Sequence, residues 1–227
     1  MGRISLWPFD GDSGADSVGS NTLTKTGTVS AVADSPIPSQ VNSAGFSGAG
    51  RYTRSAPTGV SIKPDMTMGA WIKWTTLDSG YPLVICDDAS SNYAGFQRVS
   101  GNLAVRAEDG TINKSLTSGT TIVAGTWYWV VFTISSGGVA SIYIDGVKDA
   151  SPATGPKTGG FPAAPYVVVG AKNTTGSEPF NGRVVGAFYD DDEMSEAEIA
   201  AEYAAFWPDG IVRSTDRAID RSINRSL

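Results

Sequence analysis

Two stretches bracket the chain and decide its fold: Ile4-Ser-Leu-Trp-Pro-Phe-Asp10, and Phe180-Asn-Gly-Arg-Val-Val-Gly-Ala-Phe-Tyr-Asp190. Each is rich in apolar, β-branched or aromatic residues, a composition typical of strands. The second stretch is soon followed by Ser195-Glu-Ala-Glu-Ile199, which has the pattern of a helix start. Only strand-like runs and turns lie between the two stretches. The sequence therefore predicts one sandwich whose first and last strands meet.

Composition supports an all-β domain and excludes several functions. The 227 residues include 27 Gly and 12 Pro, which favour many turns, and the length suits one large sandwich. A net charge of −6 argues against nucleic acid as a main partner. The absence of histidine excludes Ser-His-Asp and Cys-His catalysis, and the single cysteine excludes an internal disulfide.

The interior of the chain contains two decisive strand patterns. In 66–74 the apolar residues Met66, Met68, Ala70, Ile72 and Trp74 alternate onto one face. The run 127–134 is apolar on both faces, which predicts a central strand covered on both sides. Further strands are expected at 4–9, 83–86, 95–99, 103–107, 139–144, 147–148, 166–169 and 183–189. Asp145-Gly146 predicts a tight hairpin turn.

One helix is expected near the end of the sandwich. Ser195 can cap it, and Glu198 can reach back to complete a capping box. Ile199, Tyr203 and Phe206 form one apolar stripe, which predicts packing against the sandwich.

The last segment, 207–227, has a four-residue period. Arginine recurs beside aliphatic residues, in the set Arg213, Arg217, Ile219, Arg221, Ile223, Arg225 and Leu227. The helix propensity of this segment is poor, so one interpretation is a solvated tail. The other is an arm that docks on a partner or on a second copy through these residues.

These elements, in their order, resemble the laminin-G-like, concanavalin A-like family. The resemblance is carried by Leu6-Trp-Pro-Phe-Asp10, Gly45-Phe-Ser-Gly48, Met68-Gly-Ala-Trp-Ile-Lys73, Thr126 to Phe132 with Ile142 to Gly146, and Phe180-Asn-Gly182 with Ser195 to Ile199. It implies an all-β, two-sheet antiparallel jelly-roll sandwich with about six or seven strands per sheet, one short C-terminal helix and a tail. The expected division is a sandwich at 1–206 and an arm at 207–227. The fold alone does not fix a function, since it hosts lectins, adhesion modules, glycosidases and viral surface proteins.

The acidic residues are the candidates for catalysis and for metal binding. The Glu-x-Asp-x-x-Glu arrangement of related glycosidases is absent, so we expect no enzyme. No resident cofactor is expected. Family members often hold calcium, for which Asp10, Asp12, Asp16 and Asp190 are the candidates if the first and last strands pair. The alternative is that these residues form turns and a solvated loop.

A carbohydrate site would need exposed aromatic side chains beside polar groups. Trp71 lies on the face opposite the Met66 set, and Tyr81, Tyr93 and Phe161 fall near turns, so these four are the candidates; core packing is the alternative for each. The Pro- and Gly-rich stretch 151–165 is expected to be a specificity or contact loop.

Together these features favour a non-enzymatic structural protein of a virus particle, such as a bacteriophage decoration, fibre or tail-associated subunit. Neither a signal peptide nor a membrane span is found, which predicts synthesis in the host cytoplasm and residence in the virion. The expected partners are other virion proteins or copies of the chain, with cell-surface glycan as a further ligand. The alternative is a soluble carbohydrate-binding module or lectin.

Overall fold

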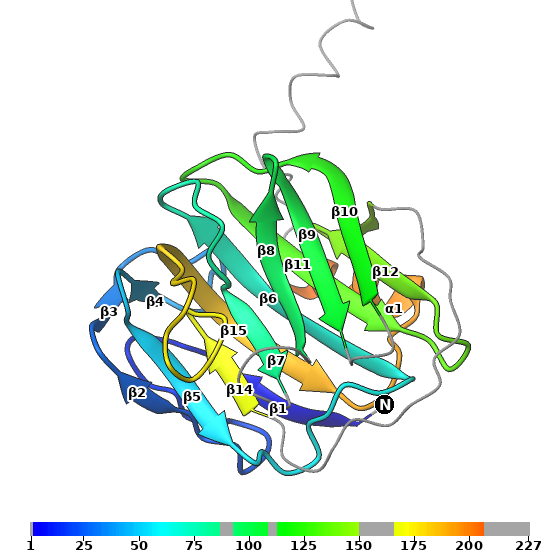
Figure 1. Ribbon diagram of the computed structural model, residues 1–227, viewed down its shortest axis with the longest axis horizontal. Coiled ribbons are helices and arrows are strands. Elements are labelled where there is room, and N and C mark those ends of the chain that lie inside the picture. Colours follow the sequence, from blue (N-terminus) through cyan, green and yellow to red (C-terminus); the bar gives the residue numbers. More distant parts are fainter. Residues whose placement is uncertain (1, 87–92, 109–112, 150–165, 207–227) are drawn as a thin grey trace, which may run out of the picture.

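The computed structural model describes residues 2–86, 93–108, 113–149 and 166–206, and Figure 1 shows them as two stacked antiparallel sheets with one helix. Over these residues, the eight-stranded sheet has the order β13 (Val147–Lys148), β12 (Ala140–Ile144), β11 (Trp127–Ile134), β6 (Met66–Trp74), β15 (Gly182–Asp190), β4 (Ser43–Phe46) and β3 (Val29–Val32), with β1 (Arg3–Trp7) also paired to β15. The seven-stranded sheet has the order β10 (Asn113–Thr121), β9 (Asn102–Glu108), β8 (Tyr93–Val99), β7 (Leu83–Cys86), β14 (Tyr166–Val169), β5 (Arg51–Ser55) and β2 (Thr24–Thr26). The predicted jelly-roll sandwich is confirmed.

The first and last strands meet, as the bracketing stretches predicted. Leu6 in β1 pairs with Phe188 in β15, and Trp7 pairs with Ala187. The first half of β15 instead pairs with β4 along the same edge. Gly186 lies where the β6 register shifts, has a φ of 58°, and donates its N–H to the Pro8 carbonyl at 3.0 Å. A positive φ at this position favours glycine.

The sandwich core lies between the sheets and contains the predicted alternating set of β6. Met66, Met68, Ala70 and Ile72 are all fully buried there. The opposite side of the same sheet is also apolar, because helix α1 (Glu196–Ala205) covers it. A second cluster forms under the helix and includes Trp71, Trp129, Val131, Val185 and Phe188. The prediction that 127–134 is covered on both sides is therefore confirmed.

Helix α1 begins with the predicted capping box. The Ser195 hydroxyl accepts a hydrogen bond from the Glu198 N–H at 3.3 Å, and the Glu198 carboxylate accepts from the Ser195 N–H at 2.8 Å. Ile199 is fully buried, and Tyr203 stacks on Trp129 with ring centroids 5.8 Å apart. The predicted apolar stripe thus packs on the sheet. No helix among the described residues is long and apolar enough to span a membrane.

Strand prediction succeeded for apolar runs and failed for polar ones. The predicted bounds of β6, β7, β11, β13 and β14 match, and Asp145 and Gly146 form the expected turn with φ values of 52° and 82°. The strands β2, β3, β5 and β10 were not predicted; β2 is entirely polar and β10 is rich in Ser, Thr and Gly, a composition that resembles that of loops.

Candidate binding pocket between the helix and the eight-stranded sheet

The aromatic residues expected to bind sugar are core residues. Trp71 is 0% exposed and lies beneath Tyr203 and Phe206 of the helix end, with centroid distances of 5.8 and 5.7 Å. Tyr81 and Tyr93 are each 1% exposed, with hydroxyls 3.0 Å apart on the outer side of the seven-stranded sheet. The expectation of exposed faces is wrong for these three, since other side chains cover them. Phe161 and the predicted contact loop 151–165 lie outside the described residues.

The four carboxylates expected to converge on calcium are engaged separately. Asp190 binds Arg3, Asp12 forms an ion pair with Lys25 at 2.5 Å, and Asp10 accepts the Asn42 N–H at 3.1 Å. Within the described part of the chain, no three acidic, histidine or cysteine side chains are grouped as a metal site. The expected convergence is therefore not found, because each group has a protein partner instead.

Asp16 shows most clearly what these acids do. Its carboxylate accepts four backbone N–H bonds, from Leu6, Val18 and Gly19 on one oxygen and from Asn21 on the other, at 2.9–3.1 Å. Burial alone would raise its pKa, but these donors outweigh burial and the pKa of Asp16 lies below its ordinary value. Asp16 therefore organises the loop that follows β1.

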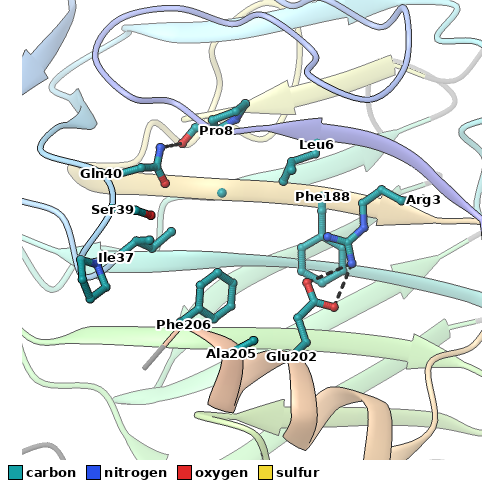
Figure 2. Close-up of a pocket in the computed structure, with 12 residues that line it drawn as sticks. Arg3, Leu6, Pro8, Ile37, Ser39, Gln40, Phe188, Glu202, Ala205 and Phe206 are labelled. Carbon is teal, nitrogen blue, oxygen red and sulfur yellow. Dashed lines mark hydrogen bonds and ion pairs between the residues drawn. The ribbon is translucent and has the colours of Figure 1, made fainter. Parts of the chain in front are cut away.

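A pocket of about 450 Å³ lies where β1, β15, the loop after β3 and the end of α1 meet, and Figure 2 shows the side chains around it. Its volume falls within the range of about 300–1,000 Å³ that is usual for ligand sites. The apolar surface comes from Leu6, Ile37, Phe188 and Phe206. Phe206, at the helix end, is partly exposed, whereas Phe188 is 1% exposed and lines the pocket from below.

Arg3 and Glu202 line one side of the pocket, and the buried Asp190 lies behind Arg3; we call these three residues the ionic corner. The Arg3 Nε donates to Asp190 Oδ1 at 2.8 Å, and Nη2 donates to Asp190 Oδ2 at 3.1 Å. Nη2 also lies 2.9 and 3.0 Å from the two Glu202 oxygens. The guanidinium carbon sits 4.1 Å from the centre of the Phe188 ring, a cation–π arrangement.

Burial within the ionic corner is uneven. The Asp190 side chain is 0% exposed, while Arg3 and Glu202 are each 24% exposed at the pocket side. Burial raises the pKa of Asp190 and of Glu202 above their ordinary values, and the charge of Arg3 opposes that rise in both. Because Asp190 is fully buried and Glu202 is not, Glu202 is the carboxylate that a ligand can reach.

The opposite wall is the loop after β3, which offers neutral polar groups. The Gln40 Nε2 donates to the Pro8 carbonyl at 3.1 Å, which turns its amide oxygen toward the pocket (Figure 2). Ser39 beside it is exposed. The wall can therefore accept hydrogen bonds from a ligand.

This wall is fixed to the sheet by Asp34. Lys73 of β6 and Arg183 of β15 are neighbours in the sheet register, and both bind the Asp34 carboxylate. The Trp127 indole N–H donates to the other carboxylate oxygen at 3.2 Å. Since Asp34 precedes Ile37 and Gln40 by a few residues, this cluster positions the loop on its side of the pocket.

Sequence reasoning did not identify the pocket residues as a site. Arg3 and Glu202 lie 199 positions apart, and no local pattern links them. Phe206 was recognised only as a member of the helix stripe. Arg3 directly precedes the strand expected at 4–9, and no sequence pattern singles it out.

Comparison with known proteins shows the family. Residues 47–200 match the sequence model of the concanavalin A-like lectin/glucanases superfamily. This is more than half of the chain, so the chain belongs to that superfamily. No curated protein matches the sequence.

Several solved structures share the fold. Domain 4 of AbnA, an extracellular arabinanase from Geobacillus stearothermophilus solved with arabinotriose, is 15% identical with a TM-score of 0.69 and aligns over 88% of this chain and 97% of its own. The receptor binding domain of botulinum neurotoxin D is 15% identical with a TM-score of 0.67, over 89% of this chain and 52% of its own. A heptameric pentraxin from Limulus polyphemus is 17% identical with a TM-score of 0.56, over 69% and 78%. At these identities the likeness concerns the fold alone.

Proposed function

We propose that this member of the concanavalin A-like lectin/glucanases superfamily is a carbohydrate-binding module, and that it binds glycan in the pocket between α1 and β15 without cleaving it. One observation carries the proposal: a partly exposed aromatic ring, Phe206, lies in the same pocket as the ionic corner and Gln40. Sugar recognition requires an apolar surface for the C–H face of a ring and a few fixed polar groups for its hydroxyls.

The polar groups suit hydroxyls because they offer both donors and acceptors. Among the hydrogen bonds of the described residues, Arg3 uses Nε and Nη2, and no bond involves Nη1. Nη1 can therefore donate to a sugar oxygen, while Glu202 and the Gln40 amide oxygen can accept from sugar hydroxyls. Because Asp190 and Phe188 hold Arg3 in place, little side-chain entropy is lost on binding.

Relatives of the same fold support a carbohydrate ligand. The AbnA domain was solved with arabinotriose, and a structure of botulinum neurotoxin type C is described as depending on two ganglioside molecules for entering cells. Those ligands are properties of those proteins. They support the class of ligand proposed for this chain and leave its identity to experiment.

Binding without hydrolysis is proposed from the state of the two carboxylates. A glycosidase needs an acid and a second carboxylate that flank the sugar bond. Here Asp190 and Glu202 bind the same guanidinium, and Asp190 is fully buried. These two carboxylates therefore cannot flank a ligand from opposite sides.

A role in a virus particle depends on residues 207–227, which lie outside the described residues. The virion role stays a prediction; it would add a location and a protein partner to the proposed glycan binding. A virion subunit with this pocket would present it to cell-surface glycan.

The test is a glycan microarray with the intact chain, followed by calorimetry on the best ligand. Gln40→Ala should weaken binding by about 1 kcal/mol, or roughly fivefold, the usual contribution of one hydrogen bond. Val41→Ala is the matched control in the same loop, because Val41 is 71% exposed and does not line the pocket. Phe206→Ala should also weaken binding, with circular dichroism to verify folding. Absence of any bound glycan would refute the proposal, and equal affinities of parent, Gln40→Ala and Phe206→Ala would move binding away from this pocket.

A further inference from the structure

We infer that the pocket selects neutral glycans and rejects acidic ones, such as uronic acid or sialylated oligosaccharides. The inference rests on the proposed function, since it names the class of glycan that the same pocket takes. Its source is the ionic corner, in which one guanidinium faces two carboxylates.

The charge count is fixed by the contacts. Arg3 is the only basic residue among the described residues that line the pocket, and it already pairs with Asp190 and Glu202. The corner therefore carries one more negative than positive charge. The acidic run continues at Asp191 and Asp192, whose charges also raise the pKa of Asp190, after burial and against the pull of Arg3.

A ligand carboxylate would meet this excess charge at short range. The remaining Arg3 donor, Nη1, belongs to the same guanidinium whose Nη2 lies 2.9 Å from a Glu202 oxygen. An anion placed on Nη1 would therefore approach Glu202 within a few ångströms, where like charges repel across a partly buried site. Asp190 cannot move away, because it is fully buried beneath Arg3.

The other described residues that line the pocket offer an anion no positive charge. Gln40 presents its amide oxygen, an acceptor, because its Nε2 is bound to the Pro8 carbonyl. Lys73 and Arg183, which anchor the loop after β3, already bind the Asp34 carboxylate. A neutral sugar has no such problem, since a hydroxyl can donate to Glu202 or Gln40 and accept from Arg3.

The experiment compares matched pairs of ligands that differ in charge. The probes are cellotriose and its C6-oxidised uronic acid derivative, lactose and 3′-sialyllactose, and arabinotriose and its C5-oxidised derivative. Affinities are measured by calorimetry on the full chain at pH 7 and low salt. We expect each acidic member to bind at least about tenfold more weakly than its neutral partner, and the gap to narrow as salt is added.

Removal of one negative charge from the protein tests the source of the selection. Glu202→Gln removes the reachable negative charge while Asp190 still holds Arg3. The difference in affinity between the neutral and the acidic ligand of each pair should therefore shrink by about tenfold. Glu196→Gln is the matched control, since Glu196 lies on the same helix, is exposed and does not line the pocket.

The outcomes separate the two ideas. Acidic ligands that bind as tightly as neutral ones, or a gap that Glu202→Gln leaves unchanged, would overturn the inference while glycan binding stands. Failure of the intact chain to bind any member of any pair would overturn the proposed function, and the inference with it.

Discussion

Gly69 of β6 should be hard to replace, because the space beside it is already filled. It lies on the outer side of β6, directly opposite Phe188 of β15. A Cβ at this position would lie 2.5 and 2.7 Å from two carbons of the Phe188 ring and 2.8 Å from the Val130 carbonyl oxygen. Real Cβ atoms essentially never approach other atoms closer than 3.0 Å, so something must move.

The loss of stability caused by Gly69→Ala depends on which neighbouring atoms can move. A shift of the Phe188 ring would disturb Arg3, which lies over it, while the Val130 oxygen belongs to the central strand β11 and is fixed by the sheet. Overpacking of this kind costs about 1–3 kcal/mol. For a chain of this size, that lowers Tm by roughly 2–4 °C for each kcal/mol. Because Phe188 supports the ionic corner, Gly69→Ala should also weaken glycan binding.

The assay is urea unfolding followed by tryptophan fluorescence. Gly119→Ala in β10 is the matched control, because its Cβ would meet only an Asp149 oxygen at 3.8 Å, and its stability should stay within about 0.5 kcal/mol of the parent. Phe188→Leu should be less damaging in the Gly69→Ala background than in the parent, by at least about 0.5 kcal/mol. A Gly69→Ala protein as stable as the parent, or purely additive effects with Phe188→Leu, would refute the close contact.

Three further predictions use other parts of the molecule. Asp16→Asn should destabilise the chain at neutral pH; the folded-state pKa of Asp16 is lowered, so its stabilisation is fully present above the ordinary value of 3.8 and lost as pH falls through the folded value. Urea unfolding of parent and variant across pH should therefore show the difference shrinking in acid, and a constant difference would contradict the carboxylate's role. Ser195→Ala should cost about 1 kcal/mol through loss of the capping box, measured by thermal unfolding, whereas an unchanged Tm would show that the cap contributes nothing. Removal of 207–227 should convert a full-length oligomer into a monomer in light scattering coupled to size-exclusion chromatography, and a monomer in both cases would rule out self-assembly through this segment.

The fold was readable from sequence where one physical signal dominated. Alternation placed Met66, Met68 and Ala70 in the core, and the positive-φ preference of Asp145-Gly146 located the hairpin. Short polar strands such as β2, whose three residues are all exposed, carry no burial pattern and become strands only through pairing with β5. Their existence depends on the assembled sheet.

The site was not readable because alternation gives the side of a strand and not what covers that side. Trp71 was placed correctly on the outer face, yet it is buried, because the helix stripe of Ile199, Tyr203 and Phe206 needs an apolar surface to cover. The two predictions, an exposed Trp71 and a helix packed on the sandwich, competed for the same surface. The helix covers Trp71 because burying its apolar stripe against the sheet removes more apolar surface from water than leaving both exposed.

The position of the pocket also explains why family membership does not supply a ligand. The family match covers residues 47–200, yet of the described residues that line the pocket only Gly186 and Phe188 lie in that range. The others come from the first forty residues and from the end of α1, which meet only because β1 pairs with β15. The shared part of the fold therefore supplies a platform, while Arg3, Gln40 and Glu202 come from outside it. Ligand choice at such a site can differ between relatives whose sandwiches superimpose, and it has to be argued from these side chains.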